Sequence, residues 1–284
     1  MAKQKQVIAH RGASSYLPEH TLEAYALAYG QGADMIEPDL VLTRDGIPIC
    51  LHDLWLETTT DVAQKFPGRA RSDGHFYAID FSLEEIKRLR AWGRAKPEQQ
   101  ASIPPCEVPT LEEMIRLIQH LNRQLNRSVG IVPEMKAPSF HRRAGKPMEE
   151  PILKVLDEAG YRGREAMALV QCFEEDALAR LRALGCDLPL VFLSANPLTP
   201  SDLDRIAKTA NGVGSNRRLI EDDTGRAVNN ASLVRECHRR GLAVYPWTFK
   251  AEEAVMHRFF HRYGVDGLFT DNPDLGVRAR NRRR

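Results

Sequence analysis

The feature that most constrains this chain is a regular alternation of short apolar segments with amphipathic segments over its 284 residues. Each apolar segment has the length of a buried strand, and each intervening segment has helical spacing. This alternation is typical of parallel βαβ units. We expect strands at 7–10, 35–42, 129–134, 167–171, 188–193, 212–214, 243–247 and 267–270. Eight such strands predict an α/β fold of the closed (β/α)8 TIM barrel type.

Local signals mark several of the helices between these strands. Thr21 precedes an apolar stripe at helical spacing and is placed to cap that helix. Ser82 with Glu85, and Thr110 with Glu113, both have the spacing of a capping box in front of an apolar run. Helix signals and strand signals therefore agree on the barrel.

One interval is too long for an ordinary barrel loop. About sixty residues separate the strand 35–42 from the helix near Thr110. They begin with Asp45-Gly46, a dipeptide typical of a hairpin turn. The remainder, at about 54–108, ends in a Pro-rich return, and we expect it to form a small cap on the catalytic face. The chain 1–284 is otherwise expected to be a single domain.

Charge and hydrophobicity exclude several classes of partner. The formal net charge is +2, and no basic stripe alternates with aromatic residues, so we expect no nucleic acid partner. No apolar run approaches the roughly 18 residues that span a bilayer, and we expect no stable membrane association. The N-terminal MAKQKQ lacks a signal-peptide core, which predicts a cytoplasmic protein, or a periplasmic one if an export signal was removed.

Neither cysteines nor helices indicate a cross-linked or obligate assembly. The five cysteines are widely spread and form no CxxC pair, so we expect buried free thiols. The outer helices of a barrel look alike whether they face water or a second subunit. Monomer and homodimer both stay open.

Ionisable side chains collect where the first strands end. His10 and Arg11 end the first strand, and Gly12 allows a sharp turn behind them. On the second strand, the period of two sends Glu37 and Asp39 to one face. Because barrel enzymes keep their active sites at the carboxyl ends of the strands, these groups mark a candidate active site.

A third carboxylate suggests a metal. Glu134 ends the third strand, and Lys136 follows two residues later on the same side. Pro38 cannot donate a ladder hydrogen bond, so it indicates a strand end or bulge between Glu37 and Asp39. Three carboxylates without cysteine or a close histidine pair favour a hard divalent cation, Ca²⁺ or Mg²⁺, over zinc.

A second histidine completes the set. His52 follows the hairpin and could face His10 across a bound phosphate. One imidazole would then accept a proton from the attacking oxygen while the other donates to the leaving alkoxide. Arg11 and Lys136 would hold the nonbridging phosphate oxygens.

Each group also has a structural explanation of its own. A histidine at a strand end is often merely hydrogen-bonded, and Glu37 with Arg11, or Glu134 with Lys136, could be plain ion pairs. Two histidines and three carboxylates at one rim make such separate explanations improbable. Trp247, at the end of the seventh strand, could pack on a glycerol backbone or on the rim itself.

These residues together resemble the glycerophosphodiester phosphodiesterase family. An HRG start, an ExD on the second strand, an HD after a DG turn and an ExK on the third strand occur together in that family. Here the motifs are His10-Arg11-Gly12, Glu37-Pro38-Asp39, His52-Asp53 and Glu134-Met135-Lys136. The resemblance runs nearly end to end.

The family implies roles for seven of the matched residues. It implies His10 and His52 as acid and base, Glu37, Asp39 and Glu134 as metal ligands, and Arg11 and Lys136 as phosphate holders. The segment TDVAQKFPGRARSDGHFYAIDFSLEEIK and the GLFTDNP ending resemble the periplasmic, calcium-using branch. One divalent cation is therefore expected, with Ca²⁺ favoured by the resemblance and Mg²⁺ open. The usual Asn of a PENT motif is His20 here, and we expect this exchange to leave the chemistry unchanged.

The resulting hypothesis is an enzyme of lipid and glycerol metabolism. It would hydrolyse small glycerophosphodiesters, such as glycerophosphocholine or glycerophosphoethanolamine, to sn-glycerol 3-phosphate and an alcohol. Water could attack phosphorus directly, or the glycerol 2-hydroxyl could first form a cyclic phosphate. The alternatives are phospholipase D- or C-like action on intact lipids and a catalytically inactive binding protein on the same fold.

Overall fold

A barrel of parallel strands forms the body of the molecule. The computed structural model describes residues 5–94 and 106–282. Its strands are β1 (Gln6–His10), β2 (Met35–Glu37), β3 (Asp39–Leu42), β4 (Pro48–Cys50), β5 (Gly130–Ile131), β6 (Glu134–Met135), β7 (Val170–Cys172), β8 (Leu190–Ser194), β9 (Gly212–Ser215), β10 (Ala243–Val244) and β11 (Gly267–Thr270). All the expected strands are present, and 267–270 agrees to the residue.

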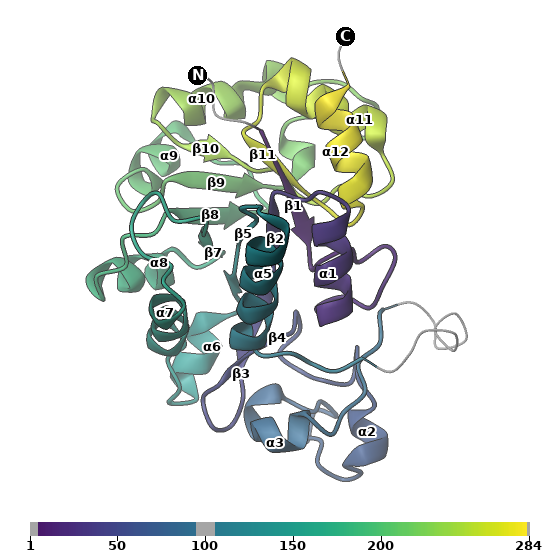
Figure 1. The fold of residues 1–284 in the computed structure, drawn as a ribbon. Coiled ribbons are helices and arrows are strands. Elements are labelled where there is room, and N and C mark those ends of the chain that lie inside the picture. The colour runs from purple at the N-terminus through teal and green to yellow at the C-terminus, as the bar shows by residue number, and fades with distance from the viewer. Residues whose placement is uncertain (1–4, 95–105, 283–284) are drawn as a thin grey trace.

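The strand order closes the sheet into a ring. One sheet runs β11-β1-β2-β5, and a second runs β10-β9-β8-β7-β6-β3-β4. Parallel bridges from Ile131 to Ala168 and from Phe249 to Thr270 join them. The predicted TIM barrel is thereby confirmed, and Figure 1 shows its strands converging in the upper part of the molecule.

Two predicted strands are each divided into two short pieces. The second breaks at Pro38, between β2 and β3, where the sequence predicts a strand end or bulge. The third breaks between β5 and β6, around Pro133. Proline cannot donate a ladder hydrogen bond, which accounts for both interruptions. The rim is therefore less regular than the continuous strands 35–42 and 129–134 that the sequence predicts.

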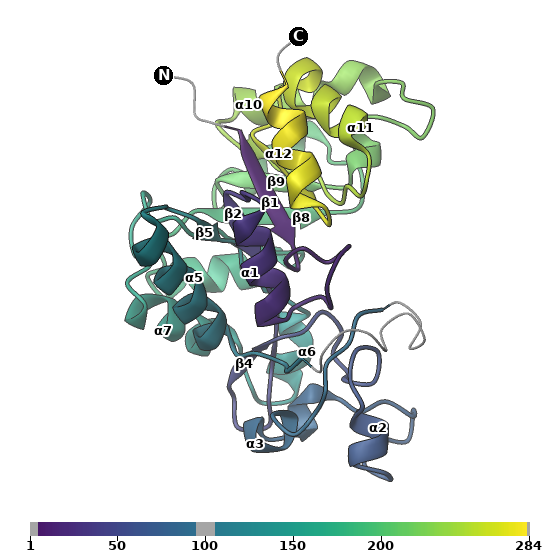
Figure 2. The same ribbon diagram turned by 45° about the vertical axis from the view of Figure 1, so that its right-hand side comes forward.

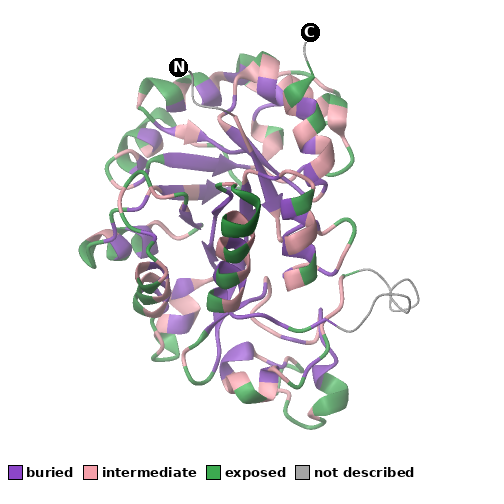
Figure 3. Cartoon of the chain, viewed as in Figure 1, coloured by how far each residue is buried: buried purple, intermediate pink, exposed green. Residues whose placement is uncertain are grey.

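Helices surround the barrel. They are α1 (Leu22–Gly30), α5 (Leu111–Leu125), α6 (Pro138–Arg143), α7 (Glu149–Glu158), α8 (Glu175–Ala183), α9 (Pro200–Ile206), α10 (Ser232–Arg239), α11 (Glu253–Arg258) and α12 (Pro273–Asn281), with short turns η2 (Arg217–Leu219) and η3 (Val228–Ala231) and the π-helical η4 (Phe259–Tyr263). Their outer faces are exposed, whereas the strands are almost wholly buried (Figure 3). Thr21 caps α1, and Thr110 forms a capping box with Glu113, as predicted.

Two apolar layers fill the space on either side of the strands. Alternate strand residues such as Val7 and Ala9 pack outward against the helices. A smaller cluster packs inside the barrel from Ile8, Met35, Val132, Val191, Leu193, Tyr245 and Phe269. All five cysteines are buried and none of them forms a disulfide, as the sequence predicts. Within the described residues, no helix is long and apolar enough to cross a membrane.

The hairpin and the segment behind it extend from the barrel. β3 and β4 pair antiparallel, with Leu40 opposite Cys50, which confirms the hairpin predicted from Asp45-Gly46. Beyond it lie α2 (Val62–Lys65), η1 (Ala78–Asp80) and α3 (Leu83–Ile86), and α3 has the predicted capping box. These pieces gather at one end of the molecule, away from the termini (Figure 2). They pack around an apolar cluster of their own that includes Leu56, Phe76, Phe81 and Ile86.

We call the segment 54–94 with 106–108 the insert. The part of the predicted cap at 95–105 lies outside the described residues.

Candidate active site

Strand periodicity places the ionisable side chains directly above the apolar cluster inside the barrel. Ile8 belongs to the inner cluster, and His10 stands two residues beyond it on the same face of β1. Met35 and Glu37 repeat this relation on β2, and Val132 and Glu134 repeat it at the third strand position. The inner face thus changes from apolar to ionisable at the carboxyl end of each strand.

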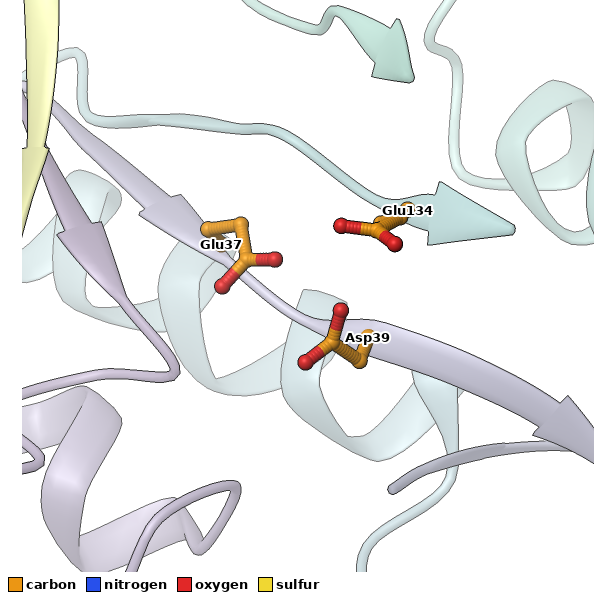
Figure 4. A group of neighbouring side chains, drawn as sticks. All are labelled: Glu37, Asp39 and Glu134. Carbon is orange, nitrogen blue, oxygen red and sulfur yellow. The ribbon is translucent and has the colours of Figure 1, made fainter. Parts of the chain in front are cut away.

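Three carboxylates converge at this end of the barrel. Glu37, Asp39 and Glu134 are only 1%, 1% and 7% exposed. One oxygen from each lies within 4.8 Å of the others, and Figure 4 shows the carboxylates directed toward a shared centre. Asp39 and Glu134 are register partners in neighbouring strands, so the backbone itself sets their spacing.

The charges in this cluster are only partly balanced. Nζ of Lys136 donates to Oε1 of Glu134 at 2.6 Å and lies 3.5 Å from Asp39. Burial works against the charged form, but Lys136 and Arg11 hold the pKa of Asp39 well below its usual range. Burial and the two neighbouring carboxylates raise the pKa of Glu37 far above normal. Burial and Asp39 raise the pKa of Glu134 to about 7.

This donor set fits a divalent cation. Two carboxyl groups with raised pKa values beside a third that is ionised show that Arg11 and Lys136 do not satisfy the cluster by themselves. A buried, all-oxygen set of carboxylates suits a hard cation. Glu37, Asp39 and Glu134 would hold it.

A tight turn after β1 positions Arg11. Arg11 and Gly12 have φ values of 59° and 83°, and a Cβ at Gly12 would lie 2.8 Å from the backbone of Ala24. Gly12 therefore serves the turn that the sequence predicts. The backbone N–H of Arg11 donates to Oε2 of Glu37 at 2.7 Å, and its guanidinium pairs with Asp39 and Glu19.

His10 is held by a residue from the opposite end of the chain. Nδ1 of His10 lies 2.7 Å from Oδ1 of Asp271, which directly follows β11. A carboxylate can only accept, so Nδ1 is the donor in this contact, and Nε2 is the ring nitrogen that Asp271 does not engage. Because β11 pairs with β1, closure of the barrel brings these two residues together.

His52 has a different set of neighbours. Its Nδ1 lies 2.6 Å from Oδ1 of the adjacent Asp53. Arg94, in the insert, contacts Asp53 at 3.0 Å and approaches His52 Nδ1 at 3.2 Å. Burial lowers the pKa of His52, so the ring is neutral at neutral pH.

A cavity of about 120 Å³ brings the predicted residues together. Its wall includes His10, Arg11, Glu37, His52, Glu134, Lys136 and Trp247. Asp39 lies in the carboxylate cluster behind this wall. Phe173 contacts the Trp247 ring edge-on at 5.6 Å and gives the cavity an apolar side. A second cavity of about 570 Å³ shares His10, Arg11 and Thr248 with the first and opens toward Glu19, Arg94 and Lys250.

Several groups of the site carry no predicted role. Gln171 lines the smaller cavity, and its buried Oε1 has no hydrogen-bond partner among the described residues. His20, whose exchange for Asn is expected to leave the chemistry unchanged, donates from Nε2 to Oδ2 of Asp39 at 2.9 Å. Asp53 and Asp271 stand inside the quoted motifs, but only their contacts reveal what they hold. Glu19 stands in the PENT-like segment before His20, but only its contacts show what it holds, and Arg94 has no sequence signal.

The fold and this rim define a class: a (β/α)8 barrel with paired histidines beside a buried acidic cluster that could hold a metal ion. The sequence profile of the Glycerophosphoryl diester phosphodiesterase family matches residues 10–275. The chain therefore belongs to this family. The predicted activity, hydrolysis of glycerophosphodiesters by a phosphoric diester hydrolase, is confirmed with it.

Individual relatives align with nearly the whole length of this chain. A glycerophosphodiester phosphodiesterase of Haemophilus influenzae is 35% identical over 98% of this chain and 90% of that protein. One of Bacillus subtilis is 32% identical over 94% and 84%. Among solved structures, a phosphodiesterase of Oleispira antarctica in complex with the product sn-glycerol-3-phosphate has a TM-score of 0.75 at 24% identity, over 97% of this chain and 96% of that one. The last likeness concerns the fold.

Proposed function

We propose that His10 and His52 are the acid and base of this phosphodiesterase, beside a cation held by Glu37, Asp39 and Glu134. One observation carries the proposal: both histidines have Nδ1 on a carboxylate and line the same cavity as the acidic cluster. Neutral His52 would accept the proton of the attacking oxygen. His10, whose imidazolium Asp271 would stabilise, would protonate the leaving alkoxide.

The remaining groups bind the substrate. Arg11 and Lys136 line the cavity and would hold the nonbridging phosphate oxygens, neutralising charge as it develops. A bound divalent cation would supply Lewis-acid polarisation of the phosphoryl group. The Trp247 indole, with Phe173 beside it, would pack on the glycerol carbons.

The leaving alcohol would face the larger cavity. That cavity meets the smaller one at His10, Arg11 and Thr248, which is where the phosphorus would lie between the two. Its volume of about 570 Å³ accommodates choline, ethanolamine or a polyol without close contact. We therefore expect a broad range of soluble head groups, with sn-glycerol 3-phosphate as the common product.

The ion and the compartment are proposed together. We propose Ca²⁺, because the insert resembles that of the periplasmic, calcium-using branch. Turnover supported by Mg²⁺ alone would instead favour the cytoplasmic location that the sequence predicts. All groups of the proposed site come from one chain, so the chemistry needs no second copy, whether the enzyme is a monomer or a homodimer. We also propose that 1–284 is one domain with a cap at about 54–108.

The test measures release of sn-glycerol 3-phosphate from glycerophosphocholine by chelator-stripped enzyme, with Ca²⁺ or Mg²⁺ added back. We expect one ion to restore turnover in the native enzyme and neither to restore it in Glu134→Ala. Glu150→Ala, which removes an exposed carboxylate on α7, is the matched control and should retain full activity. Full activity of E134A in chelator would overturn the metal site.

Phosphatidylcholine vesicles separate the enzyme from the two alternatives. We expect no release of product from vesicles and rapid release from the soluble diester. Vesicle hydrolysis would restore the phospholipase alternative. Binding of glycerophosphocholine without turnover under every ion would restore the binding protein.

A further inference from the structure

Arg94 bridges the two sides of the cavity mouth. Its Nε lies 2.9 and 3.0 Å from the two carboxylate oxygens of Glu19, in the loop that follows β1. A terminal nitrogen of the same guanidinium lies 3.0 Å from Oδ2 of Asp53, beyond the hairpin. One side chain of the insert thus joins two segments of the barrel rim, the loop after β1 and the segment after β4.

Each of these carboxylates holds a group of the proposed machinery. Oε1 of Glu19 accepts from Nη1 of Arg11 at 3.1 Å. Oδ1 of Asp53 accepts from Nδ1 of His52 at 2.6 Å. Both carboxylates are largely buried, with 9% and 13% of the side chain exposed. Without Arg94, His52 would be the one remaining ion-pair partner of Asp53 among the described residues.

The position of Arg94 also limits the charge on His52. The 3.2 Å approach of its guanidinium to His52 Nδ1 cannot be a donated hydrogen bond if that nitrogen already gives its proton to Asp53. It instead places a fixed positive charge against the ring. The charged groups that act on His52 are Asp53, Asp39, Lys136, Arg11 and Arg94.

We propose that Arg94 is a positioning residue of the active site: it fixes His52 through Asp53 and Arg11 through Glu19, and so makes the insert a working part of the catalytic centre. This inference rests on the proposed role of His52, which His52→Ala tests separately. Arg94 itself need not touch the reacting atoms. Its contribution is to hold His52 and Arg11 in position and to keep the His52 ring neutral.

The experiment compares three variants of the full-length, metal-loaded enzyme. Arg94→Ala removes the bridge, and Arg94→Lys keeps the charge but loses the forked geometry. Arg90→Ala is the matched control. Arg90 is an exposed arginine of the same insert, and its side chain forms no hydrogen bond or ion pair with the described residues. The readouts are kcat and KM for glycerophosphocholine across pH 5–9, with thermal midpoints.

We expect R94A to lower kcat at least about tenfold, because small misplacements of catalytic groups cost up to roughly 100-fold. The acidic limb of the kcat–pH profile should move to higher pH. Loss of the positive charge of Arg94 raises the pKa of His52, so a higher pH is needed to keep the imidazole neutral. R94K should retain the native limb with an intermediate kcat. Added guanidinium should restore part of the activity of R94A and leave R90A unchanged.

Other results would overturn the inference. A native kcat and native acidic limb in R94A would show that Arg94 positions nothing. A loss that comes with a lowered thermal midpoint, an unmoved limb and no rescue by guanidinium would reduce Arg94 to a structural contact. If R94A does not fold, a native kcat in R94K would equally overturn the role of the forked geometry. Full activity of His52→Ala would instead remove the proposed function of His52.

Discussion

His10 and His52 line one cavity but owe their positions to different parts of the molecule. His10 stands on β1, and its partner Asp271 follows β11, so the barrel ring itself brings the pair together. His52 follows the hairpin strand β4, its partner is the next residue, and the second contact comes from the insert. One histidine depends on closure of the core fold and the other on an appendage.

The difference separates two kinds of precision. A pair built on adjacent, buried strands shares the rigidity of the barrel, whereas a pair on a loop needs a further contact to hold it. Arg94 provides that contact from a segment with its own apolar cluster. His10 therefore depends on the ring of strands, whereas His52 also depends on the insert.

Removal of either imidazole should have the largest effect. We expect His10→Ala and His52→Ala each to lower kcat about 10²- to 10⁴-fold, the usual contribution of a positioned acid or base. Steady-state release of sn-glycerol 3-phosphate at saturating substrate measures this. His120→Ala, an exposed histidine on α5, is the control and should remain active. A loss in only one of the two variants would refute the division of labour between them.

The carboxylate partners should show the asymmetry directly. We expect Asp271→Asn to lower kcat about 10- to 100-fold, and Asp53→Asn by a smaller factor, because Asp271 would stabilise the imidazolium proposed for His10, whereas Asp53 orients a His52 ring that is proposed to act as a neutral base. The surface pair of His238 and Asp266, 2.8 Å apart, supplies the control. Asp266→Asn should leave kcat unchanged. Equal losses in D271N and D53N would break the comparison.

Many of the site residues carried by the barrel strands can be predicted from sequence. Strand ends and the period of two are visible in the sequence itself, and they lead directly to His10, Glu37 and Glu134 on the inner face. The strand 267–270 and the capping boxes are correct because their signals lie within a few residues. The breaks at Pro38 and Pro133 shift the boundaries, since proline ends pairing where the apolar pattern continues.

Contacts between distant segments have no such local signal. Asp271 is 261 residues from His10, and Arg94 is 75 residues from Glu19. Nothing in the composition of the insert shows that one of its arginines reaches the rim. Asp271 as the partner of His10, and Arg94 as the second contact of His52, therefore emerge only from the fold, even though the histidines themselves are found from sequence.

His20 extends the comparison from the histidines to the metal centre. Its ring joins Asp39, at 2.9 Å, to the hydroxyl of Tyr25, at 3.0 Å. We expect His20→Ala to weaken Ca²⁺ binding about tenfold, because residues behind a metal ligand fix its orientation. Isothermal titration of chelator-stripped protein measures this. Tyr25→Phe keeps the contact to Asp39 and should change affinity less, and unchanged Ca²⁺ affinity in H20A would show that Asp39 is held without it.

His141 is a histidine with no carboxylate partner in the described part of the chain. It lies on α6, is 1% exposed, and neither ring nitrogen has a hydrogen-bond partner among the described residues. Burial lowers its pKa to about 4. It therefore shows what burial does to an imidazole when nothing like Asp271 or Asp53 compensates.

This contrast predicts an effect on stability without one on catalysis. The pKa of His141 is lower in the folded protein, so the unfolded chain takes up the proton first, at about pH 6.5. The stabilisation by the neutral ring is thus complete above about pH 6.5 and is lost as pH falls toward 4. At pH 5.5 we expect the native protein to lose about 1 kcal/mol that His141→Leu does not lose. Urea unfolding of both at pH 7.5 and 5.5 measures the difference, and an equal fall in the two proteins would mean that His141 is protonated in the folded state as readily as in the unfolded chain.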